Sequence, residues 1–254
     1  MNYSDLHTHT YFCDGKDSPE DMVLSAISKG VETLGILVHS YTEFNPDESV
    51  DPMREKEFIA EIGALKEKYK GEINILCGTE ADYYTTSMAE GYDYIIASVH
   101  YFKRGHNYYP IDLSPAELSN IVSKLFSGDW YAMAEEYYSL VADLPKRFAG
   151  KNIALIGHID LVTKFNEDGA LFDTSHPRYV ASWQRAVDAL APFGIPFEIN
   201  TGAISRGYRK TPYPEAAIRG YIRKKGGALR LSSDSHSAKN IAFMFEDFKD
   251  CILN

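Results

Sequence analysis

Short apolar segments alternate along this chain with longer segments that are apolar on one face and polar on the other. Such repetition predicts β-strand and α-helix units arranged around a parallel sheet. Seven segments are expected to be strands, and they span residues 3–6, 33–38, 73–77, 94–99, 153–156, 195–199 and 228–232. Six segments are expected to be helices, and they span residues 18–29, 53–69, 114–126, 131–147, 177–191 and 213–225.

Two of the predicted helices begin with the same signal. Ser18 and Ser114 are each followed by a proline and then by an acidic residue within the first turn, which favours a helix start. Residues 40–51 and 102–113 follow predicted strand ends, where a barrel builds its active-site loops. No flexible linker or internal repeat divides the chain, so we expect one α/β domain spanning residues 1–254.

The composition is that of a globular protein, with 44% hydrophobic and 24% charged residues. The net charge of −10 argues against a general nucleic-acid binder, because neutralising phosphates requires a basic face. The chain has no signal-peptide pattern and no apolar run of membrane-spanning length, so we expect a cytoplasmic protein without a membrane partner. Cys13, Cys77 and Cys251 are too widely spaced to suggest a disulfide framework or a Cys-x-x-Cys zinc site.

Polar side chains that can bind a metal or an anion stand at the C-terminal end of every predicted strand. In chain order they are His7 and His9, His39, Glu80, His100, His158, Asn200 with Arg206, and Asp234 with His236. The carboxyl ends of barrel strands surround one mouth, so these groups are expected to meet there. An isolated His-x-His pair is also compatible with a surface strand, but six of the eight histidines occupy strand ends. The other two histidines, His106 and His176, are expected to be surface residues.

Motifs distributed over the whole chain resemble the polymerase and histidinol phosphatase (PHP) superfamily. They are Asp5-Leu6-His7-Thr8-His9, Asp14-Gly15, His39, Gly78-Thr79-Glu80, Ser98-Val99-His100, Gly157-His158-Ile159-Asp160 and Ser233-Asp234-Ser235-His236. The resemblance implies a distorted seven-stranded (β/α)7 barrel of the TIM-like PHP fold. Ser98-Val99-His100, His158-Ile159-Asp160-Leu161 and Glu198-Ile199-Asn200-Thr201 are most similar to the histidinol-phosphate phosphatase family.

The same resemblance implies a site for two to three divalent metal ions. One ion would be bound by His7, His9, Glu80 and Asp234; a second by Glu80, His100 and His158; and a third by Asp14, His39 and His236. The chain departs from the family at Leu37-Val38-His39, where members often have Thr-Asp-His, so the ligand is kept and its acidic neighbour is lost. Imidazole and carboxylate ligands without thiolate suit Zn²⁺, Mn²⁺ or Fe equally.

Charge favours three ions over two. Three divalent ions carry +6 and the carboxylates of Asp14, Glu80 and Asp234 carry −3, which leaves +3 for a phosphate dianion and a hydroxide. With two ions the remainder is only +1. Metals suit phosphomonoester hydrolysis because they activate water and neutralise the transferring group. We therefore expect direct attack of a metal-bound hydroxide on phosphorus, with Asp234, His236 and Arg206 as catalytic residues.

Several other side chains are predicted to contact the substrate or to orient the ligands. Arg206 is the main candidate for binding the phosphate, because the planar guanidinium can donate two parallel hydrogen bonds to phosphate oxygens. Arg209 and Lys164 are further candidates for substrate binding, and Tyr109, with its neighbours Tyr101, Phe102 and Tyr108, is expected to wall the pocket. Asp5 and Asp160 are candidates either for orienting ligand histidines or for hydrogen bonding within the helices or the barrel.

The leading hypothesis is a metal-dependent phosphatase that converts L-histidinol phosphate to L-histidinol and phosphate in histidine synthesis. The resemblance supplies the name of this small-molecule substrate. One alternative is a PHP phosphoesterase acting on a nucleotide, a sugar phosphate or phosphotyrosine. Another is a non-catalytic metal-binding module. The sequence leaves the native metal and the oligomeric state open.

Overall fold

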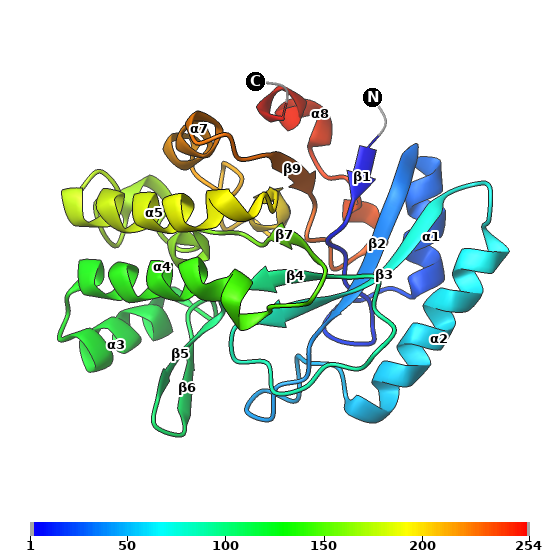
Figure 1. The fold of residues 1–254 in the computed structure, drawn as a ribbon, viewed down its shortest axis with the longest axis horizontal. Helices are drawn as coiled ribbons and strands as arrows, with labels where there is room; N and C mark the ends of the chain where they lie inside the picture. Colours follow the sequence, from blue (N-terminus) through cyan, green and yellow to red (C-terminus); the bar gives the residue numbers. More distant parts are fainter. Residues whose placement is uncertain (1–2, 253–254) are drawn as a thin grey trace.

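The computed structural model describes residues 3–252, and its centre is a seven-stranded parallel sheet (Figure 1). In sheet order the strands are β1 Tyr3–Asp5, β2 Val31–His39, β3 Asn74–Asp82, β4 Tyr94–Ser98, β7 Ile153–Ile156, β8 Phe197–Asn200 and β9 Leu229–Ser232. Just beyond β1 and β9, Thr8 pairs with Ser235, and the backbone N–H of His9 donates to the Ser235 carbonyl at 2.7 Å. The sheet is therefore a nearly closed α/β barrel, which confirms the predicted fold class.

Helices connect the strands and cover the outside of the barrel. They are α1 Pro19–Ser28, α2 Pro52–Lys68, α3 Pro115–Phe126, α4 Trp130–Arg147, α5 Pro177–Leu190, α6 Gly202–Ser205, α7 Ala216–Lys224 and α8 Phe245–Phe248. Figure 1 shows α1 and α2 on one side of the barrel and α3, α4 and α5 on the other. The six predicted helices correspond to α1–α5 and α7, with ends within three residues. Within residues 3–252, no helix has the length and apolar character needed to cross a membrane.

Local hydrogen bonding explains why α1 and α3 begin where they do. The Ser18 hydroxyl accepts the backbone N–H of Asp21, and the Asp21 carboxylate accepts the N–H of Ser18 in return. The Ser114 hydroxyl accepts the N–H of Glu117 at 3.1 Å in the same way. These caps satisfy N–H groups that have no partner within the helix. Both predicted helix starts are thus confirmed.

Tyr94 fills the inside of the barrel. Its hydroxyl donates to the Leu6 carbonyl at 2.6 Å, and its ring packs in a buried cluster with Leu37, Ile96 and Leu155. A Cβ on Gly35 would stand 2.0 Å from the Tyr94 hydroxyl, so the bare backbone of glycine is needed at this strand position. This packing closes the barrel interior beneath the chain that carries His7 and His9.

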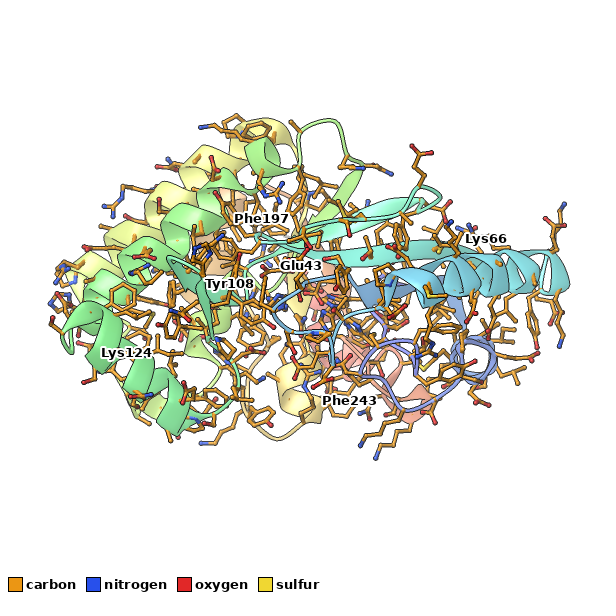
Figure 2. All side chains as sticks on the ribbon, turned by 90° about the horizontal axis from the view of Figure 1, so that it is seen from below. Glu43, Lys66, Tyr108, Lys124, Phe197 and Phe243 are labelled. Atoms are coloured by element: carbon orange, nitrogen blue, oxygen red, sulfur yellow. The ribbon has the colours of Figure 1, made fainter. Side chains whose placement is uncertain are left out.

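A β-hairpin of β5 Tyr101–Arg104 and β6 Asn107–Pro110 projects from the barrel within the segment that the sequence left unassigned. The Tyr108 ring stacks on Phe44 with 3.7 Å between centroids, and the Asn45 amide donates to the Tyr101 hydroxyl at 2.6 Å. Figure 2 shows Tyr108 near Glu43 at the middle of the face seen from below. The hairpin therefore supports loop 40–51 where the strands end.

Candidate metal centre

The first cluster of potential ligands lies just beyond β1. His7 and His9 are fully buried, and their Nε2 atoms face each other at 3.1 Å. Glu80 Oε2 lies 3.1 Å from His7 Nε2 and 3.4 Å from His9 Nε2. Asp234 Oδ1 stands 3.6 Å from each of these two nitrogens. The alternation of side chains along an extended chain aims both imidazoles at one point, as the spacing predicts.

The second cluster uses the other oxygen of the same glutamate. Glu80 Oε1 lies 3.0 Å from His158 Nε2 and 3.3 Å from His100 Nε2. The two histidine nitrogens are 3.3 Å apart. Glu80 stands near the end of β3, whereas His100 and His158 follow β4 and β7, so three neighbouring strands bring this cluster together.

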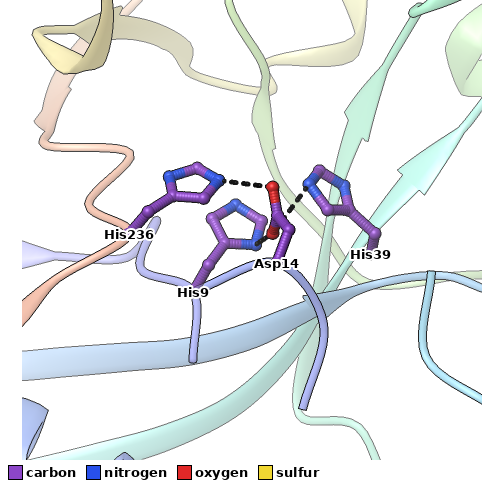
Figure 3. Close-up of side chains that lie close together, drawn as sticks. All are labelled: His9, Asp14, His39 and His236. Carbon is purple, nitrogen blue, oxygen red and sulfur yellow. Dashed lines mark ion pairs between the residues drawn. The ribbon is translucent and has the colours of Figure 1, made fainter. Parts of the chain in front are cut away.

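The third cluster surrounds Asp14 and is drawn in Figure 3. Asp14 Oδ2 lies 3.0 Å from His236 Nε2, and Asp14 Oδ1 lies 3.6 Å from His39 Nε2. The ring of His9 stacks between those of His39 and His236, with 4.4 Å between centroids on each side. Its Nδ1 stands 3.8 Å from Asp14 Oδ1, so His9 belongs to this cluster as well as to the first.

The structure thus brings all nine predicted metal ligands to one end of the barrel, which we call the mouth. The grouping differs from the prediction in two respects. His9 lies between two clusters and was assigned to only one, and Asp234 stands at the edge of the first cluster, outside its tightest group of donors. Which atoms bind which ion stays a prediction.

The second cluster has the dimensions of a metal site. Four donors that lie about 2.0–2.1 Å from a zinc ion stand roughly 3.3–3.4 Å apart at the corners of a tetrahedron. In the second cluster the three donor separations are 3.0, 3.3 and 3.3 Å. Imidazole nitrogens and carboxylate oxygens, which make up the donor set, are common zinc ligands. The residues present therefore fit divalent metal ions.

The protonation states of His9 and Asp234 suit metal binding. Burial, together with the nearby His236 and His39, lowers the pKa of His9 to about 3. Burial alone would raise the pKa of Asp234, but the Arg206 guanidinium and nearby histidines hold it well below its usual range. At neutral pH, His9 is therefore unprotonated and Asp234 is ionised, and these are the forms that coordinate a metal.

Asp234 is held in an unusual backbone conformation. Its φ is +47°, in the left-handed region that non-glycine residues seldom occupy. Gly202 lies against it, and a Cβ on Gly202 would stand 2.8 Å from the Asp234 Cβ. Arg206 NH2 donates to Asp234 Oδ2 at 2.8 Å, and Arg206 NH1 donates to the Asp234 carbonyl at 3.1 Å. Close packing and charge together fix the direction of this carboxylate.

A cavity of about 520 Å³ opens at the mouth. The predicted site residues that line it are Asp14, His39, Glu80, His100, His158, Lys164, Arg206, Asp234 and His236. Tyr109 does not line it and instead lies 5.0 Å beneath the Lys124 ammonium, so this geometry gives its predicted substrate contact no support. Tyr101 and Tyr108 line the cavity in its place.

Arg209 is also absent from the cavity wall, contrary to its predicted role in substrate binding. Its buried guanidinium lies 4.7 Å from the Tyr213 ring centroid and donates to the Thr163 carbonyl at 3.3 Å. The acids Asp160 and Glu215 favour its charged form in that position. Arg209 is therefore a counter-ion inside the protein.

Glu215, one of these acids, is expected to make the free energy of unfolding depend on pH. Burial and the nearby Asp160 raise the pKa of Glu215 to about 7, from 4.5 in the unfolded chain. Between these values the folded state binds more protons than the unfolded state, so the free energy of unfolding falls as the pH rises. We expect Glu215→Gln to reduce that fall between pH 5 and 8 by ~1–2 kcal/mol, because partial solvent exposure weakens the full effect.

The measurement is urea unfolding of both proteins at pH 5 and pH 8 with the same metal content. Every other titrating group is shared, so the difference between the two pH dependences isolates Glu215. An equal loss of stability in both proteins would show that Glu215 ionises normally in the folded state.

Two carboxylates at the site were not predicted from the sequence. Asp82 Oδ2 accepts the backbone N–H of His100 at 2.7 Å and lines the cavity. Glu198 is completely buried on β8 with Oε1 at 2.6 Å from His7 Nδ1. A glutamate inside the apolar strand 195–199 was the available signal, because a buried carboxylate needs a partner.

The residues expected to orient histidines have other partners. Asp5 accepts the backbone N–H groups of Ser233 and Ala242, both at 2.9 Å, and Asp160 accepts that of Glu215 at 2.8 Å. These bonds tie loops to the barrel, which is the structural alternative for both residues, and Asp5 also receives a backbone hydrogen bond from His7.

Among known proteins, the histidinol-phosphatase of Bacillus subtilis is 28% identical to this chain, and the alignment covers 98% of each protein. A solved structure of a candidate histidinol phosphatase from Listeria monocytogenes covers 96% of this chain and 99% of its own, with a TM-score of 0.85 and 21% identity. Histidinol phosphate phosphatase from Lactococcus lactis, solved with zinc, L-histidinol and phosphate, gives a TM-score of 0.69 at 22% identity. That similarity covers 99% of this chain and 93% of the other.

The structural similarities confirm the PHP type of barrel. The family model of the PHP domain matches residues 5–202, which is most of the chain and includes seven of the nine predicted ligands. The resemblance seen in the sequence is thereby confirmed: the chain belongs to the PHP domain family.

Proposed function

We propose that this protein is a metal-dependent phosphomonoesterase that hydrolyses L-histidinol phosphate to L-histidinol and phosphate, with residues 1–254 acting as one domain. The observation that carries the proposal is the convergence of three histidine and carboxylate clusters at one mouth, beside a cavity of about 520 Å³. The similarity to histidinol-phosphatases over nearly the whole chain supports this substrate.

We propose three divalent ions, with zinc as the first candidate because it is present in the Lactococcus lactis relative. The structure adds Asp82 and Glu198 to the three acids already counted, and it adds the positive charge of Arg206. Five carboxylates and one guanidinium would leave three divalent ions with a net charge of +2. A phosphate dianion and a hydroxide together carry −3, so three ions would leave −1 and two ions would leave −3, and three ions remain the better match.

When bound, divalent ions supply a nucleophilic water at neutral pH and neutralise charge on the phosphoryl group. The protein must hold its ligands still and orient the ester. Arg206 lines the cavity beside Asp234 and His236, where its remaining N–H groups can reach a phosphate oxygen. Lys164 lies further along the wall, with its ammonium 2.8 Å from the Asp112 carbonyl and 3.2 Å from the Asp112 carboxylate, so the two charges offset each other.

The outer wall of the cavity suits the organic part of this substrate. Phe44, Tyr101 and Tyr108 give it an aromatic surface, and Glu48 adds a carboxylate. An imidazole can pack on the aromatic rings, while a carboxylate favours a protonated amine.

The experiment is to measure phosphate release from L-histidinol phosphate, an aryl phosphate and a nucleotide monophosphate by protein of known metal content. We expect kcat/KM for L-histidinol phosphate to exceed the others by at least a factor of about 10³, since charge-assisted hydrogen bonds and ring packing both contribute. Equal cleavage of all three esters would leave a phosphoesterase of another substrate class. Metal-loaded protein that cleaves none of them would indicate a metal-binding module.

Metal removal is expected to lower stability as well as activity. Ions that bind only the folded protein stabilise it by ~2.7 kcal/mol at a concentration 100 times Kd. For a chain of this size that corresponds to a fall in Tm of roughly 5–10 °C after chelation. Calorimetry with and without a chelator measures the shift, and added zinc should restore it. An unchanged Tm would contradict a metal centre that links the strands of the barrel.

A further inference from the structure

Strand β8 contributes no residue to the three metal clusters, yet its Glu198 lies between two of them. Glu198 Oε1 lies 2.6 Å from His7 Nδ1 and also accepts the Ser232 hydroxyl. Glu198 Oε2 accepts the backbone N–H of His158 at 2.6 Å and the side-chain amide of Asn200 at 3.1 Å. Both oxygens of one fully buried carboxylate are therefore engaged on two sides.

These contacts determine the hydrogen position on His7. A carboxylate whose oxygens already receive a hydroxyl, a backbone N–H and an amide acts as an acceptor, so His7 Nδ1 is the donor in the fourth bond. With the proton on Nδ1, the lone pair of a neutral His7 stands on Nε2. That atom faces His9 Nε2 and Glu80 Oε2, both at 3.1 Å. Glu198 thus points the metal-binding nitrogen of His7 into the first cluster.

The other oxygen acts on the second cluster. His158 follows β7, and its backbone N–H is held by Glu198 while its Nε2 faces Glu80 Oε1 at 3.0 Å. The Asn200 amide that donates to Glu198 also donates to Asp234 Oδ2 at 3.2 Å. One carboxylate on β8 therefore connects a ligand of the first cluster with a ligand of the second.

We propose that Glu198 is a positioning residue that sets the tautomer of His7 and couples metal binding at the first and second clusters. This inference rests on the proposed metal centre and adds a residue that binds neither metal nor substrate. It follows that a substitution at Glu198 lowers the affinity for the ions at both clusters. A residue that only stabilised the fold would leave metal affinity unchanged once the protein is folded.

The test is Glu198→Gln. Glutamine keeps the size of the side chain but has one acceptor oxygen, so its NH₂ group must face either His7 Nδ1 or the His158 N–H. Loss of such a partner typically weakens metal affinity 10–100-fold. We expect zinc titration against a competing chelator to show a loss of about this size for two ions. Glu198→Asp, which keeps the charge, should recover part of the affinity and serves as the folded variant if Glu198→Gln does not fold.

Glu55→Gln is the matched control. Glu55 is also a buried carboxylate that accepts two hydrogen bonds, from the Ala89 N–H at 3.0 Å and the Tyr92 hydroxyl at 2.8 Å, but it has no contact with the clusters. We expect it to lower Tm and to leave zinc affinity within about twofold of the parent. Proton NMR of the zinc-loaded parent should show a low-field resonance for His7 Nδ1–H that disappears or shifts in Glu198→Gln.

Parent-like zinc affinity in folded Glu198→Gln, or an unchanged His7 resonance, would overturn the inference. Zinc binding and the resonance need no substrate, so the result is separate from the proposed activity. A parent protein that binds zinc but does not cleave L-histidinol phosphate would contradict the proposed function while leaving the role of Glu198 intact.

Discussion

Glu80→Gln is expected to lower kcat/KM at least about 10³-fold and to reduce zinc content by up to two ions. Glu80 Oε2 faces His7 and Oε1 faces His158, so one side chain serves two clusters. Glutamine would turn an NH₂ group toward one of these histidines and would remove a negative charge between them. Two metals that act as a unit fail together when their shared ligand is lost, because each supplies part of the transition-state charge stabilisation.

Phosphate release and metal analysis on the same preparation measure this effect. Asp93→Asn is the control: Asp93 accepts the backbone N–H of Cys77 at 2.6 Å and lies just before β4, away from the mouth. Its loss should reduce stability and leave metal content unchanged. Glu80→Gln protein that retained all its zinc and most of its activity would contradict a bridging role.

The barrel and the meeting of the metal ligands could be predicted because both follow from strand direction. All parallel strands present their carboxyl ends at one mouth, so residues as distant as His7 and His236 were expected to meet. The nearly closed sheet confirms the fold that this argument required. The spacing of residues in the sequence does not show that one imidazole ring can lie between two clusters. His9 was therefore assigned to only one of them.

The hairpin after β4 shows why the substrate side of the cavity was harder to predict. Four of its residues are aromatic, at 101, 102, 108 and 109, and no alternation of polar and apolar positions marks a face. In the hairpin Tyr108 pairs with Lys103 and Tyr109 pairs with Phe102, so neighbouring tyrosines point to opposite faces. A one-residue difference in register decides which tyrosine lines the cavity, and register is a tertiary property.

Glu198 was overlooked for a related reason. Its place inside a buried strand was visible, but its partners lie just after β1, just after β7 and on β9, and they are known only when the strand order is known. Asp5 and Asp160 were nearer to histidines in the sequence, yet both bond to backbone N–H groups of other loops. Sequence distance is a poor guide to the partner of a buried carboxylate.

Arg206→Ala is expected to lower kcat/KM by about 10²-fold, and Arg206→Lys to recover only part of that loss. Three contacts already use the guanidinium: Asp234 Oδ2 at 2.8 Å, the Asp234 carbonyl at 3.1 Å and His236 Nδ1 at 2.9 Å. Among the residues that the structure describes, two of the five N–H groups remain for a phosphate oxygen. Each charge-assisted hydrogen bond contributes about 1.5–3 kcal/mol, and lysine cannot reproduce the planar fork.

The control is Arg178→Ala, since Arg178 also pairs with two carboxylates, Glu135 and Asp129, but lies on α5 and does not line the cavity. It should leave kcat/KM within about twofold of the parent. For Arg206→Ala, steady-state kinetics should show the loss with L-histidinol phosphate and with an aryl phosphate alike, because the phosphate is common to both. A loss confined to L-histidinol phosphate would mean that Arg206 recognises the organic part of the substrate. Parent-like kinetics with both esters would contradict a contact between Arg206 and the phosphate.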